Sequence, residues 1–115
     1  MIVRLYTGPD GQSHFEEVSP AFAPDVGQER TPLQETEGAS FGRAQPGYFS
    51  DWHNAPRKQY VVTLAGQAEI GLGDGTLRRF NPGDVLLAED LTGKGHTTRV
   101  TGSEPRMTLT IPLRN

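Results

Sequence analysis

The chain has 115 residues, enough for one domain and too few for two separate cores. Fourteen glycines and nine prolines beside 34% hydrophobic residues favour short strands joined by many turns. A net charge of −3 argues against a nucleic-acid-binding surface, and the lack of cysteine excludes disulfides, thiolate metal sites and cysteine nucleophiles.

No segment of the sequence predicts membrane insertion or export. The longest apolar run, residues 60–65, is far shorter than the ~20 residues of a spanning helix. The first six residues include Arg4 and lack the basic leader and long apolar stretch of a signal peptide. We therefore expect a cytoplasmic protein that binds neither membranes nor nucleic acid.

Alternating apolar and polar residues predict a series of short strands. The turns between them are rich in Gly, Pro and Asp, as at residues 8–11, 73–75 and 81–84. The last segment alternates apolar residues with threonines, which is typical of a half-buried strand. The predicted strands, in chain order, are residues 2–6, 13–18, 41–44, 48–53, 60–64, 68–72, 76–80, 85–88 and 107–113.

Residues 19–38 differ from the rest of the chain. Three prolines and few large apolar side chains fall in this segment. We predict an irregular surface segment with at most one helical turn. The remaining short strands, with no convincing helix, predict an all-β sandwich or barrel in a single domain of residues 1–115.

One group of polar residues looks at first like a compressed nucleophilic triad. Ser50, Asp51 and His53 lie close together in the sequence. On a regular strand, residues 50 and 53 point to opposite faces and cannot share a proton. We therefore reject a nucleophilic triad at these positions.

A second constellation is more specific. Gly47, His53, Ala55, Gln59 and Gly66 have the spacing of the first motif of the cupin superfamily, which the chain resembles. In that family the motif reads Gly, His, a second His two positions on, Glu and Gly. Here alanine replaces the second His, and glutamine replaces Glu.

The second cupin motif is also recognisable. A Pro-Gly-Asp turn at residues 82–84 precedes a strand and then His96, although the loop 89–95 is longer than usual and Val100 replaces the family's Asn. The resemblance covers about residues 39–113. It implies an all-β, cupin-type double-stranded β-helix (jelly-roll) barrel.

The family barrel implies a cavity between the two motif strands. Strand parity turns one set of side chains toward it: His53, Ala55, Gln59, Val61, Thr63, His96 and Thr98. We expect a small polar or anionic metabolite to bind there without an obligatory metal. The expected ligand-binding residues are His53, Gln59, Thr63, His96, Thr98 and, in the connection at the mouth, Arg57.

An enzyme is the alternative that the resemblance leaves open. It would be a metal-dependent isomerase or dioxygenase in which His53, Gln59 and His96 bind Ni, Fe, Mn or Zn. Glu89 and Asp90 are candidates for proton transfer, or form a solvated acidic turn instead. His14 is a further candidate to reach the site.

The resemblance also bears on partners. Small cupins commonly pair, so we expect a homodimer, and exposed sheet edges give a physical reason for pairing. A third possibility is a protein that acts mainly through self-association or partner contact, using residues 19–38.

Overall fold

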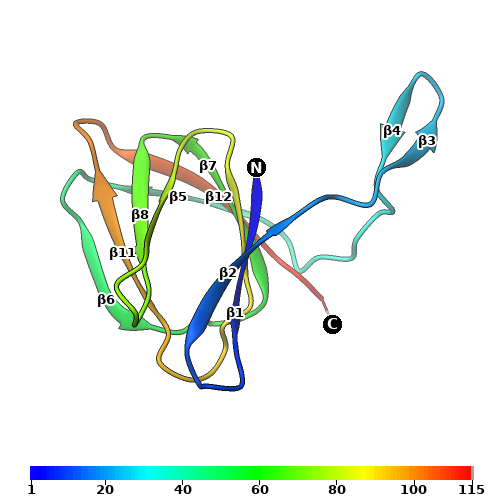
Figure 1. The fold of residues 1–115 in the computed structure, drawn as a ribbon. Coiled ribbons are helices and arrows are strands. Elements are labelled where there is room, and N and C mark those ends of the chain that lie inside the picture. The colour runs from blue at the N-terminus through cyan, green and yellow to red at the C-terminus, as the bar shows by residue number, and fades with distance from the viewer. Residues whose placement is uncertain (115) are drawn as a thin grey trace.

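The computed structural model describes residues 1–114, which form strands and no helix (Figure 1). No helix long and apolar enough to cross a membrane therefore occurs among these residues. The strands are β1 (Ile2–Thr7), β2 (Ser13–Val18), β3 (Ala23–Asp25), β4 (Gln28–Arg30), β5 (Ser40–Ala44), β6 (Phe49–His53), β7 (Gln59–Ala65), β8 (Gln67–Gly71), β9 (Leu77–Phe80), β10 (Val85–Ala88), β11 (His96–Thr101) and β12 (Arg106–Pro112).

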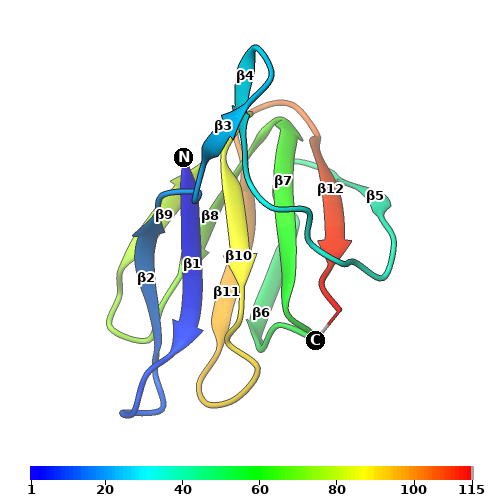
Figure 2. The same cartoon turned by 90° about the vertical axis from the view of Figure 1, so that its right-hand side faces the viewer.

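Two sheets face each other and enclose the interior, as Figures 1 and 2 show. The larger sheet has the strand order β2-β1-β10-β7-β12-β5, and the smaller has the order β6-β11-β8-β9. Every pairing is antiparallel except that of β1 with β10. This topology brings the motif strands β6, β7 and β11 around one interior.

The hydrophobic core fills the space between the sheets. In β1, alternate residues point inward, so Val3 and Leu5 are completely buried. They pack in one cluster with Ile70, Phe80 and Leu86 from both sheets. Burying each of these large side chains contributes about 1.5–3 kcal/mol, so this cluster is the main source of the barrel's stability.

The segment 19–38 is not wholly irregular, contrary to the prediction from its prolines. Strands β3 and β4 form a two-stranded hairpin that projects away from the barrel (Figure 1). Gly27 adopts a φ of 71° at the tip, and Arg30 forms an ion pair with Asp25 at 3.0 Å. These local contacts support a hairpin despite Pro24 in its first strand.

Strand β12 exists as predicted, but its apolar side faces away from the interior. Thr108 pairs with Thr63, which is fully buried, whereas Leu109 pairs with Val62 on the opposite face of β7. The outward side chains of the larger sheet form what we call the outer apolar face. It consists of Ile2, Tyr60, Val62, Val85, Leu87, Leu109 and Ile111.

Candidate functional site

A cavity of about 130 Å³ lies inside the barrel between the two sheets. It is lined by six of the seven residues predicted to point inward from the alternation along the strands: His53, Ala55, Gln59, Val61, His96 and Thr98. It is completed by Pro56, Ile70, Leu86, Ala88 and Arg106. Thr63 is buried beside the cavity without lining it, and Arg57 is not among the lining residues.

Two imidazoles form one side of the cavity. His53 of β6 and His96 of β11 occupy paired positions, and their ring centroids are 4.3 Å apart. Nδ1 of His53 lies 2.7 Å from the carbonyl oxygen of Asp51. Because that oxygen only accepts, Nδ1 carries the hydrogen, and Nε2 remains available to the cavity.

The expectation that Ser50 and His53 point to opposite faces of the strand is wrong. The Ser50 hydroxyl oxygen lies 3.2 Å from Nδ1 of His53. The pairing of β6 with β11 shifts register between residues 96 and 98, so simple alternation does not hold at this point. Nδ1 is already donating to a carbonyl and cannot take the serine proton, so the contact does not make a nucleophile.

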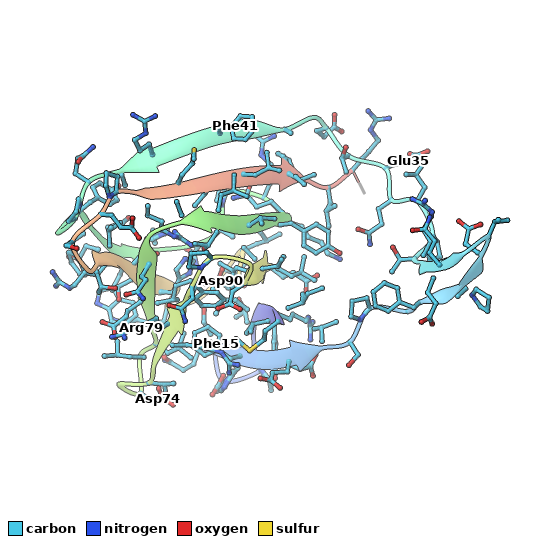
Figure 3. The ribbon with its side chains drawn as sticks, turned by 90° about the horizontal axis from the view of Figure 1, so that it is seen from above. Phe15, Glu35, Phe41, Asp74, Arg79 and Asp90 are labelled. Atoms are coloured by element: carbon cyan, nitrogen blue, oxygen red, sulfur yellow. The ribbon has the colours of Figure 1, made fainter. Side chains whose placement is uncertain are left out.

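Asp90 is the structural support of His96. Its Oδ2 accepts hydrogen bonds from Nδ1 of His96 at 2.6 Å and from the Ser13 hydroxyl at 2.8 Å. Its side chain is completely buried, and Figure 3 shows it in the barrel interior, away from Phe41 at the periphery. The solvated-turn interpretation is therefore wrong for Asp90. Its carboxylate fixes the ring of His96 and leaves Nε2 for the cavity.

The neighbouring acid has another role. Glu89 forms ion pairs with Arg4 and Lys58 and does not line the cavity. Burial raises its pKa, but the hydrogen bonds from Lys58 and Arg4 outweigh burial and lower that pKa overall. His14 is also outside the site, since its exposed ring contacts Asp10 at 3.0 Å.

Arg106 is the cavity residue that the sequence reasoning missed. It begins β12, its side chain contributes to the cavity, and the residue is only 8% exposed. Nη2 donates to the Thr63 hydroxyl at 2.9 Å, which explains why Thr63 is buried yet polar. The sequence did carry a signal: Arg106 alternates in step with the threonines of the same strand and therefore lies on the same face of the strand as they do.

The donor set does not fit the divalent metal that the cupin resemblance implies. Two imidazoles and the neutral amide of Gln59 remain, while Ala55 supplies only a methyl group. Within residues 1–114, no three His, Cys, Asp or Glu side chains are grouped so as to hold a metal ion. The Arg106 guanidinium adds a positive charge to the same cavity, which opposes a second cation.

Comparison with known proteins gives structural likenesses only. No protein-family model matches the chain, and neither does any curated protein. Among solved structures, the DMSP lyase DddQ from Ruegeria pomeroyi superposes with a TM-score of 0.54 and 27% identity. That match covers 67% of this chain and 38% of DddQ, so this chain spans well under half of that protein.

Two further solved structures resemble the chain. A Cupin 2 conserved barrel domain protein from Salinispora arenicola matches with 22% identity and a TM-score of 0.53, covering 66% of this chain and 61% of its own. An uncharacterized protein with a double-stranded β-helix domain from Klebsiella pneumoniae matches with 21% identity and a TM-score of 0.53. That match covers 79% of this chain and 81% of the other. Together with the sheet order, these likenesses identify the chain as a cupin-fold protein, a double-stranded β-helix barrel.

Proposed function

We propose that the barrel cavity binds a small polar or anionic metabolite without a resident metal. The observation that carries the proposal is a cavity between the two sheets in which His53, Gln59, His96 and Arg106 present polar groups against an apolar wall. Such a mixture of a few placed polar groups and apolar surface is typical of small-molecule sites.

The size of the cavity limits the ligand. Its volume of about 130 Å³ is well below the ~300–1,000 Å³ of typical sites for drug-sized ligands. A ligand of a few non-hydrogen atoms fits that space without rearrangement, whereas a lipid or a nucleotide does not. The proposal is therefore restricted to very small metabolites.

The test is thermal stabilisation of the full chain by a panel of small metabolites, with and without a chelator. DMSP belongs in the panel because DddQ, a structural neighbour, is a DMSP lyase. We expect at least one compound to raise the melting temperature equally in both conditions. The replacement Gln59→Leu should abolish that rise, because it removes a donor and an acceptor from the cavity.

The control variant is Gln28→Leu, which makes the same chemical change in the exposed strand β4 of the projecting hairpin. It should leave the response to the metabolite unchanged. If no compound stabilises the wild-type protein, or if both glutamine variants respond like the wild type, the proposal is wrong.

Elemental analysis separates this function from the metal-dependent enzyme. Protein purified without a histidine tag or chelator should contain no stoichiometric metal and should take up none of Ni, Fe, Mn or Zn. Near-stoichiometric metal that is lost in His53→Ala and His96→Ala would overturn the proposal and support the isomerase or dioxygenase alternative instead.

We also propose that the chain forms a homodimer through the outer apolar face. The side chains of that face are half-buried on one side of β1, β10, β7 and β12, and residues 18–22 and 31–34 lie beside the end that carries Ile2, Tyr60 and Leu87. Contiguous apolar surface of this kind favours association. A second copy is the natural occupant because two copies bring identical, self-complementary faces together around a two-fold axis.

A further inference from the structure

The guanidinium of Arg106 is buried without a counter-ion. The residue is only 8% exposed, and its one hydrogen bond within residues 1–114 runs from Nη2 to Thr63 at 2.9 Å. Its Nε is buried and has no hydrogen-bond partner. A guanidinium has five N–H donors, and Nη1 forms no hydrogen bond within residues 1–114, so it is left to solvent or a ligand.

Such an arrangement is costly in the absence of a ligand. None of the ion pairs formed by the described part of the chain includes Arg106. Burying an unpaired charge costs several kcal/mol, and an arginine cannot escape that cost by losing its proton. Burial accordingly lowers the pKa of Arg106. An anion in contact with the guanidinium would remove the penalty.

The rest of the cavity suits an anion as well. Of the residues described by the structure, no Asp or Glu lines it. His53 and His96 each have Nδ1 donating outside the cavity, so their Nε2 atoms donate to an anion only when the rings carry a positive charge. Gln59 and Thr98 add neutral donors. The nearest acid, Asp90, is already bonded by His96 and Ser13 and does not line the cavity.

The fold holds Arg106 firmly in this position. Gly66 adopts a φ of 72°, and its Cα packs closely against the backbone of Arg106. A Cβ on Gly66 would lie 2.7 Å from the Cα of Arg106, so only glycine allows this approach. The Thr63 hydroxyl then fixes the end of the side chain. The guanidinium is therefore preorganised for a ligand.

We propose that Arg106 is the ligand-recognition residue of the cavity and that the ligand is a compact carboxylate of two to four carbon atoms. The proposal rests on the function proposed above and specifies its substrate class. A planar carboxylate accepts two parallel hydrogen bonds from the paired nitrogens of a guanidinium. The cavity of about 130 Å³ sets the upper limit of size.

The experiment compares a carboxylate with its neutral isostere on the full chain. Acetate and pyruvate are titrated by calorimetry and thermal shift against acetamide, inorganic phosphate and the larger citrate. The expected order is that the small carboxylates bind, while acetamide and citrate do not. Arg106→Gln should weaken carboxylate binding by about tenfold to a hundredfold, as expected for loss of charge-assisted hydrogen bonds.

Arg43→Gln is the matched control. Arg43 and Arg106 both line a second, open depression of about 700 Å³ along β5 and the start of β12, so this variant reports binding there. It should bind carboxylates like the wild type. If carboxylate binding is lost in Arg43→Gln and kept in Arg106→Gln, the ligand binds outside and the proposal is overturned.

The remaining outcomes separate the two proposals. If acetamide and acetate bind equally, or phosphate binds and small carboxylates do not, the cavity binds a ligand but not a carboxylate, and this inference fails alone. If nothing in the wider metabolite panel binds to the wild type, the proposed function fails with it. Should Arg106→Gln not fold, the comparison of acetate with acetamide on the wild type still decides.

Discussion

Replacing Asp90 with asparagine tests whether the buried carboxylate supports the cavity. Asparagine keeps the shape of aspartate but removes its charge and places an amide nitrogen where an oxygen accepts hydrogen bonds. Oδ2 of Asp90 accepts from both His96 and Ser13, at 2.6 Å and 2.8 Å. The hydroxyl of Ser13 can rotate to accept from the new amide, but Nδ1–H of His96 would face another donor.

The loss is therefore concentrated in the bond to His96. A hydrogen bond to a charged group contributes about 1.5–3 kcal/mol, so we expect Asp90→Asn to lower the free energy of unfolding by about 2 kcal/mol. For a domain of this size, that corresponds to a fall in melting temperature of about 8–10 °C. The side chain is fully buried, so solvent does not weaken the bond.

Urea unfolding followed by the fluorescence of Trp52, the single tryptophan, measures this change directly. The slope of the unfolding free energy against urea concentration should stay the same while the midpoint concentration of urea falls, because the folded structure buries the same surface. Asp74→Asn is the matched control, because Asp74 is exposed and its hydrogen bonds to Thr76 are local contacts within one turn. A change below about 0.5 kcal/mol in Asp90→Asn, which is typical of surface positions, would refute the role given to Asp90.

Three further outcomes follow from the same structure. Gly66→Ala should destabilise the protein by about 2 kcal/mol or more in urea unfolding, because it adds a steric clash to an unfavourable φ. Gly75 has a φ of 90° and open space around it, so Gly75→Ala should destabilise the protein by only about 1 kcal/mol. The lowered pKa of Glu89 implies a contribution to stability that is fully present above the pKa of an unfolded glutamate and is lost as the pH falls through the lower folded value. In melting curves recorded at several pH values, Glu89→Gln should lose part of this acid dependence. An unchanged acid dependence would contradict the ion-pair role of Glu89. Val62 lies in the middle of the outer apolar face, so Val62→Glu should convert a dimer to a monomer in light scattering. Leu77 is exposed on the other sheet, and Leu77→Glu should leave the dimer intact. A wild-type monomer would refute the proposed dimer.

The sequence determined the strands of the barrel. Alternation of apolar and polar residues is a local property, since successive side chains of a strand point to opposite faces. It therefore located β1, β2 and β7–β10 closely, and turn residues marked the ends. The structure brings His53, Gln59 and His96 to one cavity, with β6 and β11 adjacent in one sheet and β7 in the other.

Other features depended on which strands become neighbours. Local alternation could not tell which side of β12 faces the interior, so the inward position of Arg106 was not apparent. The same alternation failed at Ser50, where a register shift between paired strands turns its side chain toward His53. The hairpin at β3 and β4 formed where prolines argued against any strand.

Tertiary structure alone decided the polar contacts of the cavity. Ser13 and Asp90 are 77 residues apart in the chain, and Thr63 and Arg106 are 43 apart. A carboxylate in a polar loop or an arginine in a strand is indistinguishable from a solvated surface charge until its distant partners are known. Burial and hydrogen bonding, which convert these two groups into parts of a site, arise only when the two sheets close over them.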